Sequence, residues 1–568
     1  MPPINTTTYM RLIECVPNFS EGNDLLKIKQ ITDAIESIEG IKLLDVDPGK
    51  ATNRTVVTFV GTPEAVVEAA FQGIKKAAEV IDMSKHKGAH PRMGATDVCP
   101  LIPISGVSVE EAVTYAKILA KKVAYELAIP TYLYEFAQEN EARKNLSVIR
   151  AGEYEGFFKK IKEPEWTPDF GPTEFPAKSG ATVIGVRNFL IAYNVNLNTK
   201  STRLANSVAF DIRENGRVVR EGNPYTGKIK IDEHGNEVRQ PGALKECKAI
   251  GWFIEEYNIA QVSINLTNHH VTSIEHAFDE SCKSAEKRGM RVTGSELVGL
   301  VPLEAMLQAG RHYLKKQNRS LGVSEDEIIH IAIKSLGLDE LGPFDPQKKI
   351  IEYQLKNIQD EKLVRMNLSA FANETASESP APGGGSISAY CGALGISLGV
   401  MVANLSAGKR GWEDKISYFS EHAAKGQKLK DALLKAVDED TRAFTYIMDA
   451  FGMPKATEEE KSARTEAIQS ATKYAVEVPL QVMQTANECL EIIEAMVKDG
   501  NPNSLSDAGV GALCVRTAVY GAYLNVKINA SGLKDKPWAD EKISKANQIF
   551  ENTEEKVKSI MQEVESKI

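Results

Sequence analysis

Short apolar runs alternate with amphipathic stretches along the first third of the chain. Each apolar run is closed by glycine, proline or polar residues, which is typical of strands that end in loops. Between the runs, apolar residues recur at helical spacing, and Thr62 and Ser108 stand where capping residues are expected. The pattern predicts strands at 11–20, 41–49, 54–61, 95–104 and 131–137, and helices at 62–83 and 108–128.

A passage rich in proline, glycine and tryptophan follows at 162–187, and its composition predicts a loop. The strand pattern returns from Asn188 and continues, mixed with helical stretches, to residue 335. The charged stretch 213–242 is expected to be a surface hairpin with no catalytic part. The predicted elements of this part are strands at 188–197, 261–269 and 296–302 and a helix at 273–288.

The pattern changes after residue 362, because the remaining chain has almost only helical periodicity. Thr457 and Glu460 have the spacing of a capping box, and Pro479 is expected to kink or interrupt its helix. The predicted fold class is α+β, with two ferredoxin-like βαββαβ-type subdomains followed by an all-α helical bundle. The predicted boundaries are 10–187 and 188–338 for the two subdomains, 339–362 for a linker and 363–568 for the bundle.

The composition of the 568 residues limits the class of protein. Hydrophobic residues make up 42% and charged residues 26%, as in soluble globular proteins, and the net charge of -9 argues against a general nucleic-acid binder. The seven cysteines are dispersed, so we expect reduced thiols, no metal site and a cytoplasmic protein. Residues 379–408 carry no charge, but their glycine and alanine content favours a buried helix over a membrane span.

The stretch HKGAHPRMGATDVCP begins at His86 and holds a second histidine, His90, close to Lys87 and Arg92. Histidine titrates near neutrality and can serve as acid and base in one turnover, while neighbouring cations favour an anionic substrate. The pattern alone also fits a structural loop with exposed histidines. Metal binding is disfavoured, because the two histidines share no helix and the nearest carboxylate, Asp97, lies past the loop.

Polar side chains gather where the first predicted strands end. In an α/β layer these strand ends lie close together, at the edge of the sheet where ligands bind. The same residue types are common in turns, so a binding role and simple turn chemistry both fit. The residues concerned are Asn18, Ser20, Glu21, Asp47, Asn53 and Arg54.

Two stretches of the helical half carry candidate chemistry. Gly383, Gly384 and Gly385 precede a helix and leave backbone N–H groups open to an anion or a flat ligand, although a flexible helix entry fits as well. Three acids follow at 438–440 on another helix, and Asp440 is a candidate for its apolar face. A carboxylate that points into a bundle is costly unless it is used, but a solvated face also explains this pattern.

These motifs resemble one known family over nearly the whole chain. The sequences ECVPNFSEG, LLDVDPGKATNRTVVTFVG, HKGAHPRMGATDVCPLIP, FLIAYNVNL and SELVGLVP are similar to the formiminotransferase domain. The sequences SPAPGGGS, AVDEDTRAF and GAYLNVKIN are similar to the cyclodeaminase domain. The two halves stand in the order of the formimidoyltransferase-cyclodeaminase family.

The resemblance implies two consecutive reactions of histidine degradation and one-carbon supply. The first half would transfer the formimino group of N-formimino-L-glutamate to tetrahydrofolate, giving 5-formiminotetrahydrofolate and glutamate. The second half would cyclise this product to 5,10-methenyltetrahydrofolate and release ammonia. Tetrahydrofolate would be a polyglutamylated co-substrate, and the enzyme would be a homo-oligomer that needs no metal, membrane or nucleic acid.

The resemblance also implies roles for individual residues. His90 would be the catalytic histidine of the first half and Asp440 the catalytic acid of the second, while His86 would be a neighbour of the site. The implied substrate contacts are Asn18, Arg92 and Asp47, the last of which would orient the amidine. The family's folate-binding residues map onto Gly171, Pro172, Thr173, Glu174, Phe175, Pro176, Ala177, Lys178, Ser179 (a tryptophan in the family pattern) and Gly180, and in the bundle onto Gly383, Gly384 and Gly385.

The sequence is also compatible with three other functions. The transferase half alone could be active, with the helical half as an oligomerisation module. The chain could instead bind folate as a scaffold without turnover. Finally, the donor could carry a formyl group on glutamate, because the two donors differ by a single atom.

Overall fold

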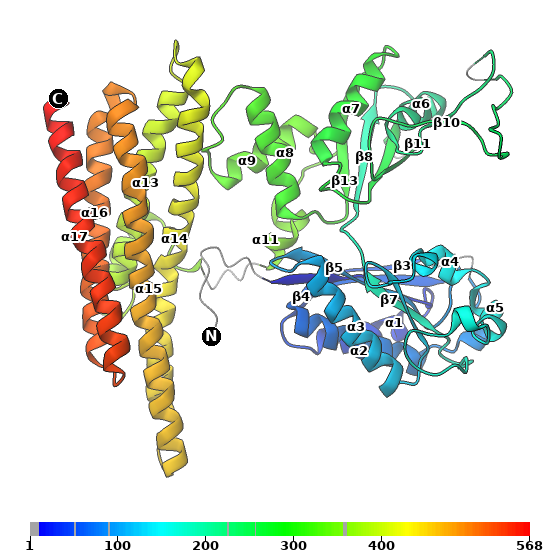
Figure 1. The fold of residues 1–568 in the computed structure, drawn as a ribbon, viewed down its shortest axis with the longest axis horizontal. Coiled ribbons are helices and arrows are strands. Elements are labelled where there is room, and N and C mark those ends of the chain that lie inside the picture. The colour runs from blue at the N-terminus through cyan, green and yellow to red at the C-terminus, as the bar shows by residue number, and fades with distance from the viewer. Residues whose placement is uncertain (1–10, 50–52, 89–90, 224–225, 256, 356–360) are drawn as a thin grey trace. The chain divides into compact units, whose positions relative to one another are not determined.

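The computed structural model describes residues 11–49, 53–88, 91–223, 226–255, 257–355 and 361–568. Contacts divide the chain into two compact units, residues 1–290 and 291–568. The predicted fold class is confirmed, because a mixed α/β region precedes an all-helical bundle (Figure 1). The two units divide within the predicted second subdomain, and the predicted domain boundaries stay predictions.

The first sheet has seven strands, and its central strands β1 and β2 pair with β4 on one side and β5 on the other. β3 pairs with the outer side of β4, and β7 and β6 extend the sheet beyond β5 as parallel strands. The strands are β1 (Leu12–Cys15), β2 (Asn18–Phe19), β3 (Ile41–Gly49), β4 (Arg54–Gly61), β5 (Thr96–Ser105), β6 (Thr131–Glu135) and β7 (Thr182–Val186).

Helices cover the two faces of this sheet unequally. Three helices pack on one face, where Ile13, Cys15 and Phe59 are fully buried; they are α1 (Leu25–Glu36), α2 (Pro63–Val80) and α3 (Val109–Glu126). On the other face, the short helices α4 (Leu146–Arg150) and α5 (Glu153–Lys160) contribute to a smaller core with Tyr132 and Val183. The strand β3 contributes no residue to this second core, and Asp47 on β3 is exposed.

Most elements of the first third lie where the apolar pattern predicts them, but α1, β7, α4 and α5 were not predicted. β7 is wholly buried, and it lies in the passage rich in glycine and proline that we predicted to be a loop. A strand buried on both faces has no alternation of apolar and polar residues, so the period-two signal is missing there. The two short helices follow β6 and have too few turns for a clear helical period.

The second sheet follows the predicted βαββαβ order along the chain. Its elements are β8 (Ile191–Leu197), α6 (Thr202–Ile212), β11 (Cys247–Ile254), β12 (Ile259–Leu266), α7 (Ile274–Glu286) and β13 (Val292–Val298), the last of which begins the second unit. β12 pairs antiparallel with β11 and with β8. β13 overlaps the strand predicted at 296–302, but it begins and ends four residues earlier.

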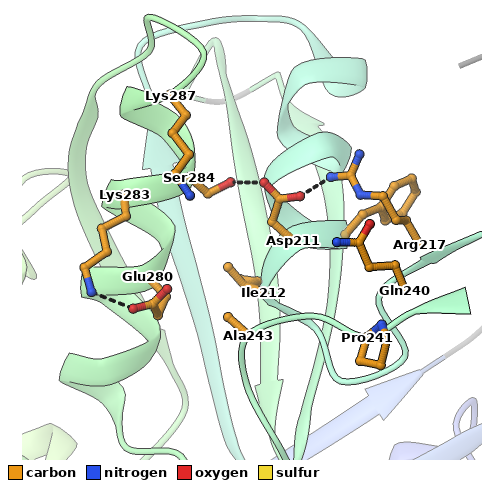
Figure 2. A pocket seen from close by; sticks show the side chains of 11 residues that line it. Asp211, Ile212, Arg217, Gln240, Pro241, Ala243, Glu280, Lys283, Ser284 and Lys287 are labelled. Atoms are coloured by element: carbon orange, nitrogen blue, oxygen red, sulfur yellow. Dashed lines mark hydrogen bonds and ion pairs between the residues drawn. The ribbon is translucent and has the colours of Figure 1, made fainter. Parts of the chain in front are cut away.

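The charged stretch 213–242 contains the predicted hairpin. Its short strands β9 (Arg217–Val218) and β10 (Arg239–Gln240) pair antiparallel. At the base of this hairpin, between α6 and α7, lies a polar cavity of about 240 Å³ (Figure 2). Asp211 at its wall accepts hydrogen bonds from Arg217 and from Ser284, at 2.8 Å, and pairs with Arg288 at 2.7 Å, so the cluster ties the hairpin to both helices.

The second unit is helical after β13. The connecting helices are α8 (Leu303–Lys316), α9 (Glu325–Leu336), α10 (Pro346–Lys349), α11 (Ile351–Leu355) and α12 (Leu368–Thr375). The bundle consists of α13 (Gly384–Ala407), α14 (Ile416–Gly452), α15 (Glu458–Asp499), α16 (Leu505–Ser531) and α17 (Lys536–Lys567), and α14 and α15 extend beyond the others at one end (Figure 1).

Two local sequence signals concern α15: a capping box at its start and a proline inside it. Thr457 and Glu460 form the predicted capping box at the start of α15. The helix runs through Pro479 without ending, so the expectation of an interruption is wrong, while the alternative of a kink stays a prediction. Buried contacts with the neighbouring helices hold this segment in helical form despite the lost N–H donor.

Helix α13 forms the centre of the bundle core. Within the described residues it is the one helix that is long and apolar enough to cross a membrane, with a mean hydropathy of 1.7, and 61% of that window is buried inside the fold. Its contacts with α14, α15 and α16 are those of a core helix. The predicted buried helix is therefore present, and the hydropathy alone is weak evidence for a membrane.

The loop between α8 and α9 is fixed to the bundle through Gly322. Its carbonyl oxygen accepts hydrogen bonds from Asn404 Nδ2, at 2.8 Å, and from Gln427 Nε2, at 2.9 Å. A Cβ atom at Gly322 would overlap Ala423 on α14. Only glycine therefore allows this close approach of the loop to the groove between α13 and α14.

We expect Gly322→Ala to destabilise the second unit by about 1 to 3 kcal/mol, because overpacking forces the loop away from α14. Thermal unfolding followed by circular dichroism measures the effect. Gly342→Ala is the matched control, because a Cβ atom at Gly342 would meet no atom within 4 Å. Equal melting temperatures for the two variants would contradict the tight docking of this loop.

Candidate active sites

The histidine motif and the predicted folate-binding stretch lie side by side in the first unit. Gly94 and Gly180 form an antiparallel bridge, and Ala95 N–H donates to the carbonyl of Ser179 at 2.7 Å. A Cβ atom on either glycine would overlap the opposite backbone, and Gly180 has a φ of +68°. Glycine is thus required at both positions. The histidine motif and the stretch 171–180, which are far apart in the sequence, are paired side by side through these contacts.

His86 is held by both of its ring nitrogens. Arg92 Nε donates to Nδ1 at 3.3 Å, and Nε2 lies 2.9 Å from the carbonyl oxygen of Asn53. The arrangement fixes the tautomer with hydrogen on Nε2. The Asn53 side chain also donates to the Lys87 carbonyl at 2.8 Å, so it ties the histidine loop to the residue that precedes β4. Both ring nitrogens of His86 therefore serve to hold the loop in place. His90 lies outside the described residues.

Arg92 is engaged by two glutamates of α5. Its guanidinium binds Glu155 with two bonds, of 3.0 and 2.7 Å, and Glu153 with one of 3.0 Å. Arg92 is 8% exposed, and the Glu155 pair raises the pKa of Arg92 while it lowers that of Glu155. The predicted role of Arg92 as a substrate contact would require an exchange of these carboxylates, because they fill its donors in this structure.

Asn18 and Asp47 lie in one row across the first sheet. Both are register partners of Val56 on β4, so all three side chains lie on the face opposite α1, α2 and α3. Asn18 is buried and donates to the Val16 carbonyl at 2.7 Å, while Asp47 is exposed. The structure thus brings two of the three predicted substrate contacts to one face of the sheet.

The predicted folate-binding stretch 171–180 is partly engaged by its own subdomain. The Phe175 ring packs against three aromatic rings of α5, at centroid distances of 4.8 to 5.7 Å. Lys178 Nζ donates to the carbonyl of Glu79 at 2.8 Å, at the end of α2. The exposed residues of this stretch are Thr173, Glu174, Ala177 and Lys178.

The second candidate site lies where α13 begins. Asp440 on α14 accepts hydrogen bonds with Oδ2 from Ser386, from its N–H at 2.9 Å and from its Oγ at 3.2 Å. Burial raises the pKa of Asp440, although the Ser386 bonds oppose the shift. Within the described chain, Oδ1 receives no hydrogen bond, and it lies against Gly385, where a side chain would overlap it.

The three acids at 438–440 contact three different partners. Asp438 accepts the backbone N–H groups of Leu363 and Val364, at 2.7 and 3.2 Å, and so fixes the chain before α12 to the bundle. Glu439 accepts a hydrogen bond from Tyr474 on α15. Asp440 alone points to the triple-glycine turn, so the interpretation of this run as a solvated face is wrong for that residue.

Sequence reasoning missed several residues around both sites. Glu153 and Glu155 were not singled out, because acids in a first helical turn are common and their contact with Arg92 is visible only in the fold. Asn525 was quoted only within the GAYLNVKIN motif, and its amide lies 3.4 Å from the position of a Cβ atom on Gly384. The described residues contain no group of three potential metal ligands.

Comparisons with known proteins match all three parts of the chain. Family models describe residues 12–187 as the formiminotransferase domain, N-terminal subdomain, residues 192–356 as the formiminotransferase domain, and residues 367–548 as formiminotransferase-cyclodeaminase. A formimidoyltransferase-cyclodeaminase of Gallus gallus is 43% identical over 96% of this chain and 97% of its own length.

Two shorter relatives each match one half. A glutamate formimidoyltransferase of Thermoplasma acidophilum is 41% identical over 54% of this chain and 93% of its own length. A methenyltetrahydrofolate cyclohydrolase of Methylorubrum extorquens is 35% identical over 35% of this chain and 97% of its own length.

Proposed function

We propose, from the premise that this chain belongs to the formimidoyltransferase-cyclodeaminase family, that it catalyses two consecutive reactions on one folate. The first half transfers the formimino group of N-formimino-L-glutamate to tetrahydrofolate. The second half closes 5-formiminotetrahydrofolate to 5,10-methenyltetrahydrofolate and releases ammonia. The observation that carries the second step is the buried carboxyl of Asp440 at the triple-glycine turn.

In the transferase step, N5 of tetrahydrofolate attacks the formimino carbon, and the C–N bond to glutamate then breaks. His90 takes the proton from N5 and gives a proton to the departing glutamate nitrogen. Asp47 orients the cationic amidine, and Asn18 lies in the same row of the sheet. His86 acts as a positioning residue, because both of its nitrogens already hold the loop.

In the cyclisation step, N10 attacks the formimino carbon, and the nitrogen of the tetrahedral intermediate leaves as ammonia. Asp440 donates the proton that ammonia needs, from the oxygen that Ser386 does not hold. The raised pKa of Asp440 keeps the acid form available, as this role requires. Gly383, Gly384 and Gly385 leave room and open N–H groups for the folate ring system.

The second half is tested apart from the first by supplying 5-formiminotetrahydrofolate directly. The proposal expects ammonia and methenyltetrahydrofolate in equal amounts without any glutamate. Absence of ammonia would favour the alternative in which the bundle is only structural. If glutamate is also not released from N-formimino-L-glutamate and tetrahydrofolate in a parallel assay, the result would favour a folate-binding scaffold. Supplying N-formyl-glutamate in place of the formimino donor tests the remaining alternative.

The cofactor, location and partners are also part of the proposal. The co-substrate is tetrahydrofolate in its polyglutamylated form, and no metal takes part. The enzyme is cytoplasmic and acts on small molecules without nucleic acid or membrane, which its net charge of -9 and its dispersed cysteines support.

A homo-oligomer is supported by an apolar face on α13 and α16. Large hydrophobic side chains that are 37 to 70% exposed follow these neighbouring helices, and on α16 they recur three, four or seven residues apart, as residues on one side of a helix do. We propose that a second copy of the chain covers this face. Its residues are Leu394, Met401, Leu405, Val510, Leu513, Tyr520, Leu524 and Ile528.

We expect Leu524→Glu to lower the oligomer mass, because a charge buried at the interface is costly. Size-exclusion chromatography with light scattering measures the mass of each variant. Tyr125→Glu is the control, since Tyr125 on α3 is 72% exposed and belongs to the other compact unit of the chain. An unchanged mass for Leu524→Glu would exclude this face as the interface.

A further inference from the structure

Glu14 is a buried acid that none of the proposed steps uses. It lies on the central strand β1, between Val60 on β4 and Ile102 on β5, and only 4% of it is exposed. Within the described part of the chain, its carboxylate receives no hydrogen bond and has no cation within 4.0 Å. Burial raises the pKa of Glu14 to about 7, and the more distant charge of Arg187 opposes this shift.

A carboxylate without a partner at the centre of a sheet is costly to the fold. The neighbouring Cys15 packs into the core under α1, α2 and α3, so Glu14 points to the opposite face. A methylene chain in its place would fill the same space without this cost. The acid is therefore better explained by a ligand than by the stability of the sheet.

The face of the sheet that carries Glu14 also carries two of the three predicted substrate contacts, Asn18 and Asp47. Asn18 pairs with Val56, and Glu14 pairs with Val60, four residues further along β4. Residues at even separation on one strand share a face, so both side chains, and that of Asp47, lie on the same side. Glu14 thus lies, buried, on the same face of the sheet as two of the predicted substrate contacts.

We propose that Glu14 binds a planar N–C–N edge of a transferase substrate through two parallel N–H···O bonds. The two oxygens of a carboxylate match two adjacent N–H donors, as they do in a carboxylate–guanidinium pair. Both substrates of the proposed reaction offer such an edge: the formimino group of the donor and the 2-amino-pyrimidinone edge of the pterin. This inference rests on the proposed function, because that function supplies the two candidate ligands.

Steady-state kinetics of Glu14→Gln with each substrate varied in turn tests the inference. Glutamine replaces one acceptor oxygen by an N–H donor, so one of the two KM values is expected to rise by about 10- to 100-fold. The other KM should stay within about two-fold, and the substrate that is affected identifies the edge. Two unchanged KM values with an active wild-type enzyme would overturn the inference and leave the proposed function intact.

Glu135→Gln is the matched control, because the exposed Glu135 ends β6, an outer strand of the same sheet, and its carboxyl also interacts with the charge of Arg187. If its KM values change as those of Glu14→Gln do, the effect is a general loss of charge near Arg187 and the inference is wrong. Both variants should fold, and Glu14→Gln should melt at a higher temperature than the wild type at pH 8, because it removes a buried charge. Wild-type protein without glutamate release would instead refute the proposed function.

The pH dependence of the unmodified enzyme gives an independent test. Only the ionised carboxylate accepts two N–H bonds, so the KM of the affected substrate should fall as pH rises through about 7. The other charged or titratable groups near Glu14 are Arg187, Tyr134, the thiols of Cys15 and Cys99, and Lys42. Lys42 and Glu14 are both register partners of Val60. Burial raises the pKa of Tyr134 and of Cys15, away from neutrality. A KM that is flat across this range would contradict the inference.

Discussion

Replacing Asp440 by asparagine is expected to slow ammonia release by about 10²- to 10⁴-fold, which is the usual contribution of a positioned general acid. Asparagine keeps the size of the side chain and one oxygen for the Ser386 N–H, but it has no acidic proton to give to ammonia. The transferase rate should stay at the wild-type level. The measurement is the rate of ammonia and methenyltetrahydrofolate formation from 5-formiminotetrahydrofolate.

Asp438→Asn is the matched control for this experiment. Asp438 is two residues away on the same helix and holds the backbone of Leu363 and Val364. We expect this change to lower stability but to leave the rate of cyclisation unchanged. If Asp440→Asn keeps its activity, the carboxyl serves only to hold the first turn of α13, and the proposed chemistry of the second site is wrong.

Replacing His90 by alanine is expected to slow glutamate release by about 10²- to 10⁴-fold, because the proton transfers at N5 and at the leaving nitrogen lose their carrier. Added imidazole should restore part of the rate, since the proposed role is chemical and not structural. Release of glutamate in a single-turnover assay with tetrahydrofolate measures both effects. The bundle should still convert 5-formiminotetrahydrofolate at the wild-type rate.

His86→Ala distinguishes between the two histidines of the motif. The contacts of His86 with Arg92 and Asn53 predict a loss of rate that imidazole does not restore, because the loop loses its anchor. His330→Ala, an exposed histidine on α9, should change nothing. Rescue of His86→Ala but not of His90→Ala would reverse the assignment.

The sequence predicts the fold well where the periodicity of apolar residues is clear. β4 spans Arg54–Gly61, the predicted residues, because its run of β-branched and apolar residues favours a strand and Gly61 ends it. β7 was missed because a strand buried on both faces lacks alternation. Pro479 does not interrupt its helix, because packing in a 42-residue helix outweighs one lost hydrogen bond.

The candidate sites depend more strongly on the three-dimensional fold. The run at 438–440 shows three acids, but only the fold tells which of them meets Ser386. Likewise, no spacing links Arg92 to Glu155, which lies 63 residues further along the chain. Glu14 stands in a quoted motif, but nothing in the sequence shows that its carboxylate is buried and without a partner. Contacts between charged residues that are far apart in the sequence therefore cannot be predicted from local sequence patterns.

The central claim is that one chain carries both activities, and one assay tests it most directly. Purified protein is mixed with N-formimino-L-glutamate and tetrahydrofolate, and glutamate, ammonia and the absorbance of methenyltetrahydrofolate are followed together. We expect the three products in equal final amounts. Glutamate without ammonia or absorbance would contradict the claim for the helical half, and no glutamate at all would contradict it for the transferase half.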